Sequence, residues 1–193
     1  MIALAWPGDT VRRRAIIGDW KALPLESGSM GAVMGDGALS MLDWPEGAAT
    51  LLAELWRVLR PGGRAVVRCF ATAEVPETLE FMPNSMVKYG MSFHEFRLRF
   101  NMAAARADGM VGITSARLFE HYQTVIRDAA LADWPEGGLA EIEAYAGSAY
   151  IHCYPKRSEL ADLLQAAWRG PWQFVETSGY PGAELCPLLV LDR

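Results

Sequence analysis

The stretch LLAELWRVLRPGGRAVVRCF, residues Leu51 to Phe70, constrains the fold more than any other part of the chain. Its first half places apolar residues at the helical spacing i, i+3, i+4 and i+7, namely Leu52, Leu55, Trp56 and Leu59. Pro61 to Gly63 then favours a helix stop and a tight turn. Arg64 to Phe70 is almost wholly apolar, which predicts a strand. A near-continuous apolar strand directly after a helix indicates an α/β fold with a parallel sheet covered on both faces.

The same stretch carries a family resemblance. The run ELWRVLRPGG, residues Glu54 to Gly63, resembles the helix and turn that precede the fifth strand of class I S-adenosylmethionine-dependent methyltransferases. The resemblance implies an α/β fold with a Rossmann-like methyltransferase sheet, mostly parallel, with an antiparallel C-terminal strand.

A second motif lies upstream. Ala15 to Ile17 is predicted to be a short buried strand, and Gly18, Asp19 and Trp20 follow at its carboxyl end, the edge where parallel α/β sheets bind ligands. In the methyltransferases that the chain resembles, the third strand ends similarly. The resemblance implies that Asp19 accepts a hydrogen bond from the adenine amino group of the cofactor and that the backbone N–H of Trp20 meets the ring. The alternative is that Asp19 is only a turn or helix-cap residue.

A third motif follows the next predicted strand, Ala32 to Met34. Gly35, Asp36 and Gly37 match by position the loop that, in the family, borders the methionine half of the cofactor and the substrate. Two glycines allow a ligand to approach the backbone closely. Asp36 either orients a donor group of the substrate or caps the next turn, and the sequence leaves both alternatives open.

The domain organisation that we expect is a single methyltransferase-like domain over 1–193. Residues 1–70 form the cofactor-side core, 71–157 form an insertion that covers the substrate, and 158–193 form a C-terminal helix and strand pair. The elements predicted in this last section are a helix over Ser158–Trp168 and strands over Trp172–Thr177 and Cys186–Leu191.

The middle section is predicted to hold a helix over Ser92–Arg106, a strand over Gly112–Phe119 and a paired strand over His121–Ile126. Its aromatic residues either line an apolar substrate pocket or pack against the sheet. We select His94 and Tyr122 as candidates for substrate contact, because both side chains can exchange protons.

Two hallmarks of the family are not found in the sequence: the glycine-rich loop after the first strand and the acidic residue that binds the ribose. The resemblance therefore implies that the chain opens inside the helix after the second strand and lacks the first two strands. Because this would expose a strand edge, we expect upstream sequence, a partner chain, a second copy or a rearrangement of the fold to cover it.

Composition and motifs exclude several other classes. The chain has 18 Lys and Arg against 23 Asp and Glu, a net charge of −5, which argues against nucleic acid as the partner. No apolar run is long enough for a membrane span. The 3 cysteines are far apart, as expected of reduced thiols in a cytoplasmic protein. The 3 histidines lack metal-ligand spacing, so no metal is predicted, and neither a P-loop nor a GxSxG elbow occurs.

The function implied by the resemblance is methyl transfer from S-adenosylmethionine to a small-molecule acceptor, with activity depending on the N-terminal part being supplied. Such catalysis is largely positioning, so the sequence names no catalytic residue. The alternative is a non-catalytic methyltransferase-like scaffold or partner-binding protein. The missing glycine loop favours this alternative, whereas Gly18, Asp19 and Trp20 favour the enzyme.

Overall fold

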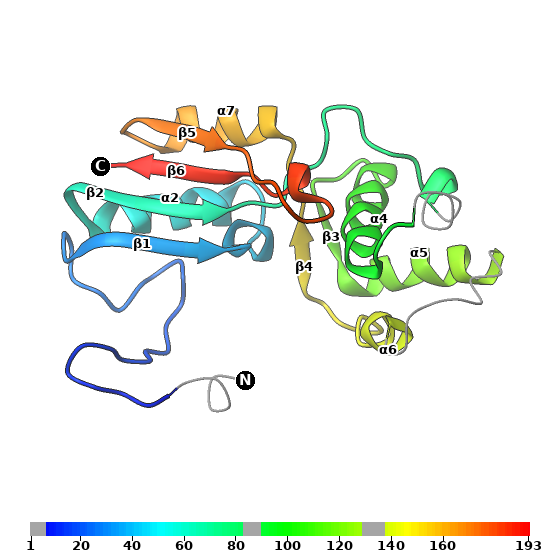
Figure 1. Cartoon of the computed structure of the whole chain (residues 1–193), viewed down its shortest axis with the longest axis horizontal. Helices are drawn as coiled ribbons and strands as arrows, with labels where there is room; N and C mark the ends of the chain where they lie inside the picture. The colour runs from blue at the N-terminus through cyan, green and yellow to red at the C-terminus, as the bar shows by residue number, and fades with distance from the viewer. Residues whose placement is uncertain (1–6, 83–89, 129–137) are drawn as a thin grey trace.

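The computed structural model describes residues 7–82, 90–128 and 138–193. These residues form two lobes: a sheet with two helices, and a helical lobe at the carboxyl end of the first two strands (Figure 1). We predicted that the chain begins within a helix, but residues 1–6 lie outside the described residues.

The main sheet has four strands in the order β1-β2-β6-β5. They are β1 (Met30–Asp36), β2 (Leu59–Arg68), β6 (Leu188–Asp192) and β5 (Trp172–Val175). The first two are parallel, and β6 is antiparallel to both of its neighbours. Three strands thus share one direction, which confirms the predicted α/β sheet, mostly parallel with an antiparallel C-terminal strand.

The helix–turn–strand at the centre of the sequence forms as expected, with shifted boundaries. Helix α2 spans Glu46–Val58, and β2 begins immediately at Leu59. Pro61 to Gly63 therefore does not separate helix from strand. It forms an irregularity at the start of β2, where Gly62 takes φ +75° and the register against β1 shifts.

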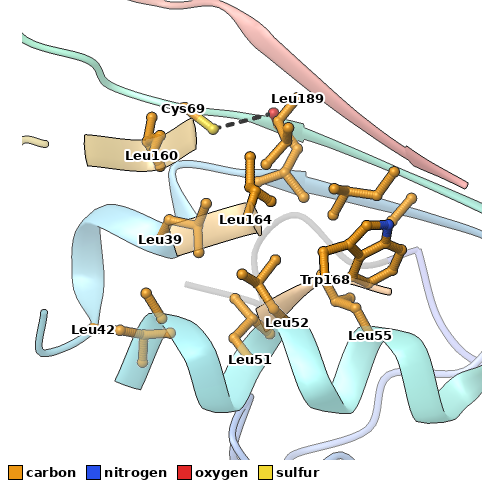
Figure 2. Close-up of a cluster of buried hydrophobic side chains, with 14 of the residues drawn as sticks. Leu39, Leu42, Leu51, Leu52, Leu55, Cys69, Leu160, Leu164, Trp168 and Leu189 are labelled. Carbon is orange, nitrogen blue, oxygen red and sulfur yellow. Dashed lines mark hydrogen bonds between the residues drawn. The ribbon is translucent and has the colours of Figure 1, made fainter. Parts of the chain in front are cut away.

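Helices α2 and α7 (Arg157–Ala167) cover one face of the sheet. Figure 2 shows side chains of α2, α7 and the strands meeting in this core, with Trp168 at one end. In the described part of the chain no element covers the other face, and Met34 on it is 88% exposed. The prediction of a sheet covered on both faces is therefore wrong for these residues.

The predicted strand at Ala15 to Ile17 does not form. These residues are exposed, Ile17 by 97%, and no strand precedes β1 in the described residues. An isolated three-residue strand buries little surface, so without a neighbouring strand its backbone gains no ladder of hydrogen bonds.

The helical lobe contains η2 (Leu79–Phe81), α4 (Phe93–Ala107), α5 (Ser115–Asp128), α6 (Gly138–Glu143) and a two-stranded antiparallel sheet of β3 (Gly112–Thr114) and β4 (Ile151–Cys153). The predicted helix at Ser92 is confirmed, with Ser92 as its N-cap. Both strands predicted between Gly112 and Ile126 are wrong beyond Thr114. Leu118 and Tyr122 are fully buried at the helical spacing i, i+4 on α5.

Two short helices link the lobes. Helix η1 (Ala38–Met41) follows β1 and packs against β4, while η3 (Ala183–Leu185) precedes β6. Helix α7 begins after Lys156, so Ser158 lies inside it rather than at the predicted cap. None of the described helices is both long and apolar enough to cross a bilayer.

Candidate functional site

The carboxyl end of β1 is a glycine turn that leads directly into η1. Gly37 takes the left-handed conformation, with φ +65°, and its N–H donates to the Arg68 carbonyl over 3.0 Å. A Cβ at this position would lie 2.8 Å from the Phe70 ring. Only glycine fits such a turn without strain or displacement of the ring. The chain thus turns sharply where the ends of β1 and β2 meet.

Asp36 is held by a cation on the neighbouring strand. Its carboxylate oxygens accept from Nε and Nη2 of Arg68 at 2.6 and 2.8 Å, across the register pair of β1 and β2. Donation to the Asp36 carboxylate raises the pKa of Arg68, although burial opposes the shift. Asp36 does not cap η1, because Gly37 occupies the cap position without any side-chain cap bond. Orientation of a substrate donor by Asp36 stays a prediction.

Asp19 lies in an exposed loop rather than at a strand end. Its Oδ1 accepts from the N–H of Lys21 over 2.8 Å, and Asp19 pairs with Ala22 in an isolated bridge. Asp19 therefore has the contacts of a turn residue, which was the alternative to a role in adenine binding. The neighbouring indole of Trp20 is 44% exposed. Both side chains are open to a ligand despite the turn.

The loop that carries Asp19 is fastened to α2. The N–H of Leu23 donates to Glu54 Oε2 over 2.9 Å, and Nη2 of Arg57 donates to the Leu23 carbonyl over 3.0 Å. The hydrogen bond from Arg57 lowers the pKa of Glu54, against the effect of burial. Lys21 Nζ lies 3.9 Å from Asp43 Oδ1, just beyond η1. The contacts with Glu54 and Arg57 fasten the loop near the C-terminal end of α2, whereas the Lys21–Asp43 pair brings Lys21 to the N-terminal side of α2, which follows the glycine turn and η1.

The two residues selected for substrate contact lie elsewhere. Tyr122 has no exposed surface: it stacks on Phe100 with centroids 4.1 Å apart, and its hydroxyl donates to Asn101 Oδ1 over 2.8 Å. A substrate cannot reach it in this structure, so the selection of Tyr122 is corrected to a core role. His94 is exposed on α4, its ring 5.9 Å from that of Phe93.

One pair of polar residues was missed by sequence reasoning. Ser115 Oγ and His152 Nε2 lie 2.9 Å apart where α5 begins beside β4. The sequence shows no signal that joins residues 37 positions apart. Within the described residues no cluster of three or more His, Cys, Asp or Glu side chains suits a metal ion.

Comparison with known proteins finds one family model that matches part of the chain. Residues 2–67 match the family model described as "Methyltransferase domain". The matched segment contains the Asp19 loop, the glycine turn and most of β2. Over this segment the chain is similar to methyltransferase domains, in line with the resemblance to the class I S-adenosylmethionine-dependent methyltransferases. No curated protein matches the chain.

Solved structures give weaker likenesses. A SAM-dependent methyltransferase from Methanosarcina mazei is 13% identical, with a TM-score of 0.44, over 91% of this chain and 65% of the other. The 1,6-didemethyltoxoflavin-N1-methyltransferase of Burkholderia thailandensis is 16% identical, with a TM-score of 0.48, over 100% and 54%. The geranyl diphosphate C-methyltransferase of Streptomyces coelicolor is 12% identical, with a TM-score of 0.42, over 92% and 50%. The chain thus spans between half and two thirds of the length of these proteins.

Proposed function

We propose that this chain binds S-adenosylmethionine and transfers its methyl group to a small-molecule acceptor. The observation that carries the proposal is the family match over residues 2–67, which includes both loops expected to border the cofactor. Asp19 and Trp20 would hold the adenine, and Gly35, Asp36 and Gly37 would flank the methyl donor. The section 71–157 would cover the acceptor.

The residues present fit the two ends of the cofactor. Asp19 is exposed, and an ionised carboxylate that accepts one backbone N–H retains capacity for an adenine amino group. The exposed indole of Trp20 offers an apolar face beside it. The described residues contain neither a glycine-rich loop ahead of β1 nor an acidic strand end for the ribose. The fit therefore covers the adenine and the methyl end.

The chemistry asks this chain mainly to bind and orient. The cofactor supplies an electrophilic methyl group when bound. The Arg57–Glu54 pair fixes the loop that meets adenine, and Arg68 holds the Asp36 carboxylate in one orientation at the glycine turn. Fixed groups of this kind lower the free-energy barrier of methyl transfer, because the reactants are already oriented when the reaction begins. Asp36 would accept a hydrogen bond from the acceptor.

The choice of a small-molecule acceptor rests on charge and on the relatives. The net charge of −5 disfavours nucleic acid. The Burkholderia protein carries bound 1,6-didemethyltoxoflavin, and the Streptomyces protein is named for geranyl diphosphate, both small molecules. We also propose a cytoplasmic location, because the three cysteines are free thiols, as is usual in a reducing compartment.

Calorimetric titration with S-adenosylhomocysteine tests the proposal. We expect saturable heat with micromolar affinity, and roughly tenfold weaker binding for Asp19→Ala, which loses a hydrogen bond to a charged acceptor. Asp162→Ala is the matched control, since this exposed aspartate lies on α7, away from the Asp19 loop. No heat from a folded sample would refute the proposal.

A second candidate function, a non-catalytic scaffold that binds a partner chain or a second copy, is favoured by one observation. Strand β1 has only one neighbour among the described residues, and Met34 is exposed on the open face of the sheet. Unpaired edges and apolar patches commonly mark association surfaces. A folded chain that binds no S-adenosylhomocysteine but forms a stable complex would support this candidate.

A further inference from the structure

A small pocket lies between the helical lobe and the end of η1, the short helix that follows the glycine turn. Its lining includes Met41 from η1, Tyr145, Tyr150, Ser115 and His152, and its volume is about 230 Å³. Ligand pockets commonly measure about 300–1,000 Å³, so this one suits a small ring or the reacting end of a larger molecule. Met41 is the last residue of η1, which begins directly after Gly37, so one short helix connects the residues assigned to the methyl donor with the lining of the pocket.

The polar part of the pocket is a Ser115–His152 pair, and hydrogen bonds to the Tyr150 carbonyl hold Ser115 in place. Ser115 is 2% exposed, and its N–H donates to the Tyr150 carbonyl over 2.8 Å. Its Oγ lies 2.9 Å from His152 Nε2 and 3.4 Å from the same carbonyl. In one tautomer, Nε2–H donates to Oγ, and the hydroxyl donates onward to the Tyr150 carbonyl. This tautomer leaves Nδ1 with its lone pair free, and no hydrogen bond within the described residues engages Nδ1.

The surroundings favour a neutral imidazole. The rings of Tyr145 and Tyr154 lie with centroids 5.6 and 6.4 Å from that of His152. Burial lowers the pKa of His152, and the Arg97 guanidinium on α4 lowers it further. No described carboxylate is paired with the ring to offset these effects. A neutral imidazole is the form that can accept a proton.

We propose that His152 is the general base that removes a proton from the acceptor, that Ser115 positions its ring, and that the acceptor is a planar ring bearing a hydroxyl or N–H group. We infer a planar ring in the acceptor because the pocket is lined by aromatic side chains. We infer a hydroxyl or N–H group because the Ser115–His152 pair leaves a nitrogen that can accept its proton. This inference rests on the proposed methyl transfer and names the class of acceptor for it.

The step balances without any further reactant. The O–H or N–H bond of the acceptor breaks, and its proton passes to Nδ1 of His152. The lone pair released on that oxygen or nitrogen forms the bond to the methyl carbon. The carbon–sulfur bond of S-adenosylmethionine breaks, and its electron pair stays on sulfur, which gives S-adenosylhomocysteine. Nε2–H continues to donate to Ser115 throughout, so the imidazolium keeps its orientation.

The test uses 4-nitrophenol, an acidic phenol whose anion absorbs visible light. Slightly below the pH at which the phenol ionises in solution, we expect the folded chain to raise the phenolate band in a saturable manner. His152→Gln should abolish the rise, and Ser115→Ala should shift its pH dependence, whereas Ser115→Thr restores it. His121→Gln is the matched control, because this histidine pairs with Asp108 away from the pocket. An unchanged rise in His152→Gln, or no rise with the folded wild type, would overturn the proposal.

A second measurement needs no variant. Nitrogen-detected NMR of the wild-type histidine rings should show His152 changing from neutral imidazole to imidazolium when 4-nitrophenol saturates the chain. A ring that stays neutral would overturn the assignment of the base. Titration with S-adenosylhomocysteine separates the two proposals. Cofactor binding without phenolate formation refutes the base alone, and phenolate formation without cofactor binding refutes the methyl transfer alone.

Discussion

At the scale of single residues, Gly37 determines the shape of the end of β1. Gly37→Ala introduces both a left-handed alanine and a Cβ 2.8 Å from Phe70. Gly62→Ala, with φ +75° and no atom within 4 Å of the added Cβ, introduces only the first. We expect Gly62→Ala to cost about 1–2 kcal/mol, and Gly37→Ala to cost about 1–3 kcal/mol more through overpacking. Urea unfolding measures both, and equal losses would contradict the close contact with Phe70.

Glu54 gives a prediction for pH. Its pKa is lowered in the folded chain. Its contribution to the free energy of unfolding is therefore fully present above the unfolded pKa of about 4.3. That contribution is lost as the pH falls through the folded pKa. We expect Glu54→Gln to destabilise the chain by about 1 kcal/mol at neutral pH, and the difference from wild type to vanish in acid. Thermal unfolding across pH measures it.

The matched control for this prediction is Glu176→Gln. Glu176 also pairs with an arginine, Arg157, but its side chain is 63% exposed. A pair in that setting contributes little, so its loss should change stability less at every pH. If the two variants behaved alike, Glu54 would not be the anchor of the Asp19 loop.

At the scale of elements, Trp168 joins α2 to the sheet. It is 6% exposed, its ring lies edge-on to that of Trp56 at 5.1 Å, and its Nε1 is buried with no partner among the described residues. Trp168→Phe keeps most of the packing and removes the unpaired N–H, so we expect a change within about 1.5 kcal/mol. Trp168→Ala should cost about 3–5 kcal/mol. A large loss in Trp168→Phe would show that the N–H has a partner.

The elements that sequence reasoning predicted well are those with strong periodicity or clear breakers. Helices α2, α4 and α7 and the four strands of the main sheet follow the predicted order, with ends shifted by a few residues. Helix α5 was read as strand because its apolar residues alternate with polar ones in places, although Leu118 and Tyr122 keep helical spacing. The strand predicted at Ala15 to Ile17 rests on a short apolar run and the motif that follows it, but no neighbour among the described residues pairs with it.

The candidate site was predictable only where a motif marks it. The glycine turn and the Asp19 loop were identified from the sequence, because the family repeats them at recognisable spacing. The support of Asp36 by Arg68, and of the loop by Glu54 and Arg57, depends on contacts about 30 residues apart. The burial of Tyr122 and the Ser115–His152 pair likewise result from how α5 packs beside β4. No local pattern encodes such contacts.

At the scale of the whole molecule, the open face of the sheet is the feature that distinguishes this structure from a fully covered α/β fold. Met34→Lys places a charge on this face. We expect stability to change by less than about 0.5 kcal/mol, and self-association in sedimentation experiments to fall. Val67→Lys, on the covered face where Val67 is 2% exposed, is the contrasting variant and should unfold the chain. If Met34→Lys also unfolded it, the face would be covered in the natural molecule.

The central claim is that the Asp19 loop and the glycine turn border one cofactor. Amide NMR of the labelled chain titrated with S-adenosylhomocysteine tests it most directly. We predict that the amides of Lys21 to Leu23 and of Gly35 to Gly37 shift together, with one shared binding curve. Shifts confined to one of these segments, or to neither, in a folded and saturated sample would contradict the account.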